Sequence, residues 1–196
     1  MHTSLPRGLV LATLLALSSA CLFATDAKTK AKTLIDFTKR DVEFDGGSPK
    51  PVNKYDYSYE AWDGKLVFLE GKGVLIPALP GNGGMGRDAG LTFGASTAGE
   101  IAIAVGNRNE AESFTVSMVD TDGTEVSWYL SLQDKPRGLP ISYPLPLDQP
   151  SKEEKPGKKP GFNMAKIKTW QIKGNWQPAK LEIILIRLTA LPPAAP

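Results

Sequence analysis

The clearest structural signal in this chain lies in residues 114–132, which read FTVSMVDTDGTEVSWYLSL. Apolar residues alternate with polar or small ones on both sides of Asp122-Gly123. Alternation with a period of two is typical of a strand that buries one face, and Asp-Gly between two such runs is typical of a hairpin turn. The stretch therefore predicts a β-hairpin with Trp128 on the buried face and Tyr129 on the opposite face.

Short apolar or alternating segments indicate further strands along the rest of the chain. They comprise residues 34–37, 55–59, 65–76, 91–94, 100–105, 162–172 and 181–191. Residues 165–170 have room for one helical turn, and no other segment has the pattern of an amphipathic helix. Many short strands with turns between them predict an all-β fold. Roughly eight or nine strands with minimal helix fit a jelly-roll β-sandwich best.

The N-terminus has the features of a targeting segment. Arg7 precedes an apolar run and then Ser18-Ser19-Ala20, and this order is typical of a secretory signal peptide. We therefore expect an exported protein, either extracellular or periplasmic. The predicted organisation is a signal peptide over 1–24 (cleaved somewhere between 20 and 27), a flexible lead-in over 25–33, one β-sandwich domain over 34–191 with loops at 80–90 and 149–161, and a disordered tail over 192–196.

Cys21, the only cysteine, lies at the end of this segment. If cleavage leaves it as the first residue, it would carry a lipid and anchor the protein to the cell envelope. A bacterial lipoprotein usually has Leu three positions before that Cys, where this chain has Ser18. Ordinary cleavage that discards Cys21 is therefore favoured, and lipidation stays open as the alternative.

Charge and residue types exclude several classes of function. A net charge of +2 does not favour binding to nucleic acid. The only histidine is His2, inside the predicted signal peptide, so no Ser-His-Asp or Cys-His centre is expected in the processed chain. Zinc is disfavoured for the same reason, and no cofactor is expected.

One turn resembles the start of a calcium loop. Asp120-Thr121-Asp122-Gly123 has suitable oxygen ligands, but the twelfth residue from Asp120 is Ser131, where an EF-hand requires Glu. We therefore interpret this sequence as a hairpin turn in which Asp side chains bind local N–H groups. A structural calcium ion has no support from the sequence.

Four segments together resemble the galactose-binding-like superfamily of carbohydrate-binding-module β-sandwiches. They are the opening strand 34–37, the hairpin 114–132, the segment 165–174 and the closing apolar strand 181–191. The resemblance implies a jelly-roll fold more than an activity, since one fold hosts many functions. Many members hold calcium with an Asp in the closing strand, where this chain offers only Glu182.

Carbohydrate binding would use aromatic rings beside polar groups. Trp62 and Trp176 border turns, and Tyr129 lies on the face opposite Trp128. Polar candidates come from the predicted loop 80–90 and from the residues that follow the strand 100–105. The expected ligand contacts are Trp62, Arg87, Asp88, Asn107, Arg108, Tyr129 and Trp176.

The sequence thus favours a non-catalytic, exported module that binds a polysaccharide or another glycan. The first alternative is a structural or protein-interaction domain of the cell envelope. The second is a glycoside hydrolase or lyase that uses two carboxylates across a groove. Contact with a membrane is expected only through a lipid on Cys21.

Overall fold

The computed structural model describes residues 30–39, 41–45, 48–52, 57–88, 91–94, 96 and 98–192. The predicted signal peptide, Cys21, residues 25–29 of the lead-in and residues 193–196 of the tail lie outside these ranges. None of the described residues is helical, and none therefore belongs to a helix that could cross a membrane.

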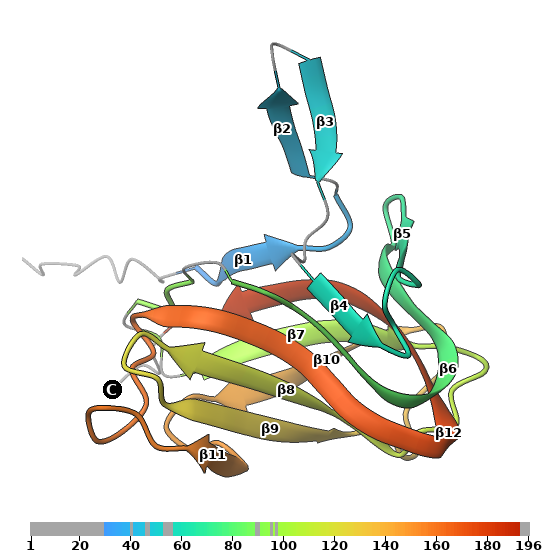
Figure 1. Ribbon diagram of the computed structural model, residues 1–196. Helices are drawn as coiled ribbons and strands as arrows, with labels where there is room; N and C mark the ends of the chain where they lie inside the picture. Colours follow the sequence, from blue (N-terminus) through green and yellow to red (C-terminus); the bar gives the residue numbers. More distant parts are fainter. Residues whose placement is uncertain are drawn as a thin grey trace, which may run out of the picture.

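Twelve strands form the described part of the chain (Figure 1). They are β1 (Lys32–Asp36), β2 (Asp41–Asp45), β3 (Ser48–Val52), β4 (Tyr57–Glu60), β5 (Val67–Leu69), β6 (Gly73–Arg87), β7 (Ala98–Val105), β8 (Ser113–Asp120), β9 (Glu125–Ser131), β10 (Pro140–Pro146), β11 (Lys152–Lys155) and β12 (Ile167–Ala190). Strands β2 and β3 pair only with each other, as a hairpin that projects from the body in Figure 1.

Two long strands connect two layers of sheet. The first half of β12, residues 167–175, pairs with β8 and with the end of β6. This front sheet has the order β11-β9-β8-β12-β6-β4. The second half of β12, residues 180–190, pairs with β7, with the start of β6 and with β1. Together with β10 and β5, these strands form the back sheet.

The core lies between the two sheets. The rings of Phe114 on β8 and Tyr143 on β10 meet edge to face, with centroids 5.8 Å apart. From β9, the indole Nε1 of Trp128 donates a hydrogen bond to the carbonyl of Pro146, at the end of β10. Trp128 and Trp170 are both 2% exposed, and the burial of Trp128 agrees with its predicted face of the hairpin. The all-β jelly-roll sandwich is therefore confirmed.

The predicted hairpin is β8–β9, and Asp120 stabilises its turn. The Asp120 carboxylate is fully buried and accepts hydrogen bonds from the backbone N–H groups of Asp122, Thr124 and Asn163, at 2.8 to 2.9 Å. Gly123 has a φ of +93°, a conformation that favours glycine. Asp120 thus acts as a cap on local backbone groups, as its interpretation as a turn residue predicts.

The glycine-rich segment 80–90 is a strand up to Arg87, so the predicted loop is wrong there. Its remaining residues 89–90 lie outside the described residues. Turn-forming composition gave the wrong prediction because three of these glycines, Gly83, Gly84 and Gly86, lie under aromatic rings on both faces of the sheet, which leaves no space for side chains there. The other predicted loop, 149–161, contains the short edge strand β11.

Three further details differ from the expected pattern. Residues 167–172 and 181–190 of two predicted segments belong to one continuous strand, β12, and its start at Ile167 falls inside the expected helical turn. Leu91 forms only an isolated bridge to Ile167. Strand β10 was not predicted because its three prolines are unusual in a strand, but β10 is an edge strand, where proline is tolerated.

Candidate functional site

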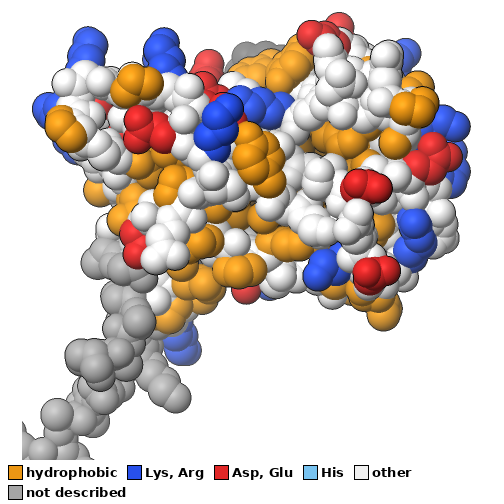
Figure 2. All heavy atoms as spheres, turned by 90° about the horizontal axis from the view of Figure 1, so that it is seen from below, with side chains coloured by type: hydrophobic (Ala, Val, Ile, Leu, Met, Phe, Trp, Pro, Cys, Tyr) orange, Lys and Arg blue, Asp and Glu red, His pale blue; other side chains and the backbone are white. Residues whose placement is uncertain are grey.

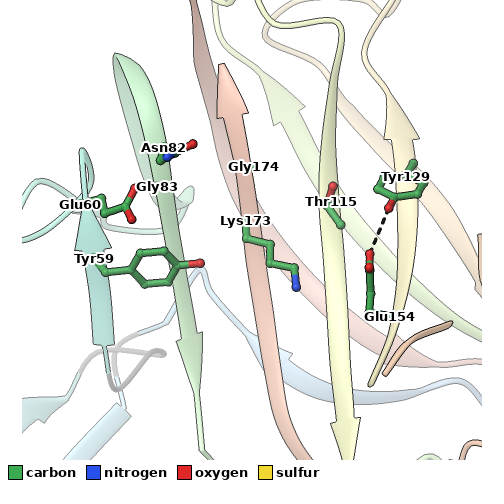
Figure 3. A pocket seen from close by; sticks show the side chains of 9 residues that line it. All are labelled: Tyr59, Glu60, Asn82, Gly83, Thr115, Tyr129, Glu154, Lys173 and Gly174. Carbon is green, nitrogen blue, oxygen red and sulfur yellow. Dashed lines mark hydrogen bonds between the residues drawn. The ribbon is translucent and has the colours of Figure 1, made fainter. Parts of the chain in front are cut away.

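A row of side chains crosses the outer face of the front sheet. Tyr59 on β4, Gly84 on β6, Lys173 on β12, Thr115 on β8 and Tyr129 on β9 are successive cross-strand partners. Figure 3 shows Tyr59 and Tyr129 at opposite ends of this row, with Lys173 and Thr115 between them. Four strand spacings separate the ends, which amounts to about 19 Å. The strand register alone therefore places two aromatic rings at the two ends of one surface.

Glycines on β6 let two tyrosine rings lie against the sheet. A Cβ atom at Gly84 would overlap the Tyr59 ring, and one at Gly86 would come within 2.6 Å of the Tyr57 hydroxyl oxygen. The Tyr59 side chain is half-buried, so part of its ring remains accessible. Aromatic rings held in this way have apolar faces that pack well against other flat apolar surfaces.

Tyr129 is the most exposed ring of the row, with 51% of its surface accessible. Its hydroxyl donates a 3.0 Å hydrogen bond to Glu154 Oε1, and Glu154 Oε2 forms a 2.7 Å ion pair with Lys152. The hydrogen bond to the Glu154 carboxylate raises the pKa of Tyr129, so the phenol stays protonated. Strand β11 thus fixes the orientation of an otherwise free aromatic ring.

Lys173 is held by a carboxylate in the floor of the same face. Its Nζ lies 2.6 Å from Glu125 Oε1, which also accepts a 2.8 Å hydrogen bond from Ser117 Oγ. Burial opposes ionisation of Glu125, but the hydrogen bonds from Lys173 and Ser117 outweigh it and lower its pKa. Burial, followed by the charges of Glu60 and Glu125, raises the pKa of Tyr59. The centre of the row is therefore a neutralised ion pair beside a protonated phenol.

Two open cavities lie on this face. The first, here called the main groove, has a volume of about 350 Å³ and extends from Tyr59 to Glu154. The second, here called the side arm, has a volume of about 410 Å³ and reaches Gln177. Both volumes are within the range of small-molecule sites in proteins. Thr115, Tyr129 and Gly174 line both cavities, so the two lie next to each other with a shared wall.

Trp62 and Trp176 are not exposed platforms, contrary to the expectation from their turns. They are 0% and 6% exposed and stack on each other inside the sandwich, with centroids 4.9 Å apart and ring planes 11° apart. Gly83 and Gly174 lie beneath them, where a Cβ atom would be 2.5 to 2.8 Å from an indole carbon. Of the expected aromatic contacts, Tyr129 alone lies in the groove as an exposed ring.

Asn107 and Arg108 are exposed, as expected, but they line a different cavity from that of Tyr129. The Arg108 guanidinium forms a 2.7 Å ion pair with Glu182, and its Nε donates a second hydrogen bond, at 2.8 Å, to the same oxygen. The Arg108 backbone N–H donates to the other Glu182 oxygen. Arg108 thus neutralises a buried carboxylate in the closing strand, which is a structural task.

Arg87 and Asp88 lie at the end of β6. Arg87 is half-buried and pairs in register with Trp170, while Asp88 is exposed and accepts a 2.9 Å hydrogen bond from Thr169 Oγ1. Neither residue lines the main groove or the side arm. Across the described residues, no group of three or more His, Cys, Asp or Glu side chains is arranged to hold a metal ion.

Sequence reasoning missed Tyr59, Lys173 and Glu154. The alternation of Tyr55, Tyr57 and Tyr59 gave a partial signal, because it predicted a strand with aromatic residues on one face. Lys173 and Glu154 carried no signal, since only the register of β12 and the position of β11 bring them beside Tyr59 and Tyr129.

The face of the molecule seen in Figure 2 has mixed charge. On the side seen in Figure 2, Lys and Arg side chains are interspersed with Asp and Glu, in keeping with the net charge of +2. The residues that line the main groove include two carboxylates, Glu60 and Glu154, and one ammonium group, Lys173. A ligand rich in hydroxyl groups suits such a surface better than a strongly anionic one.

Comparison with known proteins gives a fold but no family. No family model matches the sequence, and no curated protein matches it. The family 11 carbohydrate-binding module of the cellulosomal cellulase Lic26A-Cel5E of Clostridium thermocellum is similar over 82% of this chain and 94% of that module, with a TM-score of 0.50 and 15% identity. An agarase, AgWH50C, matches 83% of this chain with a TM-score of 0.52 and 10% identity, over 26% of its own length.

A third solved structure, CsCBM6-3 from Clostridium stercorarium in complex with cellobiose, is 14% identical over 71% of this chain and 89% of that one, with a TM-score of 0.41. The chain thus has a β-sandwich like that of carbohydrate-binding modules, as its four resembling segments predict.

Proposed function

We propose that this protein is an exported, non-catalytic module that binds a polysaccharide chain across the outer face of its front sheet. The observation that carries the proposal is the cross-strand row from Tyr59 to Tyr129, which places two accessible aromatic rings along one groove. Sugar rings have apolar C–H faces that pack on such rings. The carbohydrate-binding module with a similar fold, and the agarase that is similar over 26% of its length, support the same class of ligand.

Polar groups beside the rings would bind the hydroxyl groups of the sugars. Asn82 and Thr115 line the main groove, and Asn82 is exposed. Amide and hydroxyl side chains both donate and accept hydrogen bonds, which matches the chemistry of a sugar hydroxyl. Lys173 adds further donors, and its charge is balanced by Glu125.

Two carboxylates of this face, Glu125 and Glu154, support binding rather than hydrolysis. A glycosidase needs one carboxylic acid that stays protonated until it donates to the leaving group, and its pKa is raised for this purpose. The pKa of Glu125 is lowered, as described above. The ion pair with Lys152 also lowers the pKa of Glu154, and both groups are therefore ionised near neutral pH.

The test is affinity electrophoresis of the purified protein through gels that contain one soluble polysaccharide each, with and without calcium. We expect retardation by at least one polysaccharide. Tyr59→Ala and Tyr129→Ala should each weaken binding roughly fivefold to tenfold, the value of about 1 kcal/mol of ring contact.

Leu139→Ala is the matched control, because Leu139 is 60% exposed and lies outside the groove. The electrophoretic mobility of Leu139→Ala in the polysaccharide gels should equal that of the unsubstituted protein. If the folded protein passes every gel without retardation, the proposal is wrong and a structural or protein-interaction role takes its place.

A further inference from the structure

The side arm joins the main groove at its middle and not at its end. The shared residues Thr115, Gly174 and Tyr129 lie on β8, β12 and β9. The main groove continues past them on one side to Tyr59 and Glu60, and on the other side to Glu154. The side arm leaves this line along β8 and β12 towards Gln177. The two cavities therefore adjoin in the arrangement of a main line with a side branch.

The walls of the side arm have the chemistry of a sugar site of its own. Phe114 and Trp176 are among the residues that line the arm, although both are almost completely buried. Asn175 and Gln177 are exposed and contribute amide groups, and Glu112 contributes a carboxylate. No lysine or arginine is among the described residues that line it. These groups suit a neutral sugar and do not suit a uronate or a sulfated one.

The position of Asn175 gives the arm a defined shape. Its Oδ1 accepts a hydrogen bond from the backbone N–H of Gln177 at 3.2 Å, which fixes the turn of the chain beyond the front sheet. The indole Nε1 of Trp176 donates to the carbonyl of Ser113 at 2.8 Å, across the base of the arm. Both walls are thus tied to the sheet, so the arm exists before a ligand arrives.

We propose that the ligand is a decorated polysaccharide, with its backbone in the main groove and a neutral side-chain sugar in the side arm. This inference rests on the proposed function and adds the class of polysaccharide to it. A linear chain would occupy only one of the two paths. A backbone with a side-chain sugar would fill both and would bury the shared surface at Tyr129 from two directions.

The experiment compares matched pairs of glycans by isothermal titration calorimetry with the purified protein. One pair is a linear β-glucan and xyloglucan, and the other is linear mannan oligosaccharides and galactomannan. We expect the decorated member of at least one pair to bind about tenfold more tightly than its linear counterpart.

Two variants test the side arm itself. Gln177→Ala removes an amide group from the wall of the side arm. Ser113→Phe places an aromatic ring at its base, and Ser113 is suitable because its side chain is exposed. Each should reduce binding of the decorated glycan about fivefold to tenfold and change binding of the linear one by less than twofold. Gln133→Ala is the matched control, because Gln133 is an exposed glutamine outside both cavities.

The possible failures are distinct. Equal affinity for both members of each pair, or an equal loss on both members in Gln177→Ala, would overturn the branched-ligand proposal and leave glycan binding intact. Binding to none of the four glycans, by a protein that another polysaccharide retards in gels, would overturn it and leave the proposed function intact. No retardation in any gel would overturn both. Thermal unfolding of each variant shows whether a loss of binding comes from a loss of fold.

Discussion

The two faces of the glycine-rich part of β6 carry aromatic rings, but they expose them very differently. On the inner face, Trp62 lies over Gly83 and is completely buried. On the outer face, Tyr59 lies over Gly84 and is only half-buried, in a groove that leads to the exposed ring of Tyr129. The same device, a ring lying on a glycine, therefore stabilises the core on one face and leaves a surface available for a ligand on the other.

The largest expected effect is a loss of stability caused by a substitution on the inner face. Trp62→Ala should lower the free energy of unfolding by about 3 to 5 kcal/mol, the usual cost of removing a buried Trp ring. Tyr129→Ala should change it by less than about 0.5 kcal/mol, because that ring is mostly exposed. Urea denaturation followed by circular dichroism measures both. Equal destabilisation by the two variants would contradict the difference between the faces.

Neighbouring glycines sharpen the comparison. Gly83→Ala places a Cβ atom 2.8 Å from Trp62 Cδ1, and the buried indole has no space to move, so we expect a loss of about 1 to 3 kcal/mol. Gly84→Ala displaces the Tyr59 ring, which can move outward into solvent.

We therefore expect Gly84→Ala to weaken glycan binding at a smaller cost in stability than Gly83→Ala. Urea denaturation and affinity electrophoresis of the two variants side by side give the comparison. A larger stability loss in Gly84→Ala than in Gly83→Ala would show that the Tyr59 ring is part of the core.

A smaller effect is expected at the edge of the groove. Glu154→Ala removes the acceptor of the Tyr129 hydroxyl hydrogen bond, so the Tyr129 ring becomes mobile in the free protein. Ligand binding must then restrict this motion, which has an entropic cost. The cost of about 0.5 to 1 kcal/mol corresponds to roughly threefold weaker glycan binding. Calorimetric titration measures it. Tighter binding in Glu154→Ala would mean that the hydrogen bond holds Tyr129 away from its binding position.

The smallest effect concerns pH and Glu125. Because its pKa is lowered in the folded protein, its ion pair with Lys173 stabilises the fold above the usual carboxyl value of 4.5. This contribution is lost as the pH falls below that value and through the folded pKa. Glu125→Gln should remove this part of the pH dependence, which is below about 1 kcal/mol for a pair near the surface.

Urea denaturation at a series of pH values from neutral to acid, on the protein and on Glu125→Gln, measures this difference. Parallel stability curves for the two proteins would show that the ion pair contributes nothing to the pH dependence.

Local pattern predicted much of the fold. Alternation and the Asp122-Gly123 turn predicted the hairpin β8–β9 and the opposite faces of Trp128 and Tyr129, because both depend on neighbouring residues. The pattern failed for residues 80–87, since glycine is favoured in turns and equally under a packed ring. It also failed for Trp62 and Trp176, because the two rings bury each other from distant parts of the sequence and Trp62 also lies over Gly83.

The site was predictable only in part. Tyr129 was identified because its own strand shows its face. Tyr59 and Lys173 could not be connected with it, since no local signal gives the register of β4, β6, β12 and β8. Arg108 was predicted as a ligand contact from its place after a strand, and no local signal indicated its ion pair with Glu182 of the distant closing strand.

The most direct test of the account is nuclear magnetic resonance of the isotopically labelled protein during titration with a polysaccharide fragment that retards it in gels. The account predicts that amide shifts change at β4, at residues 82–86 of β6, and around Thr115, Tyr129 and Lys173, while the amides of 106–110 stay unchanged. Shift changes centred on residues 106–110, with the outer face of the front sheet unaffected, would contradict it.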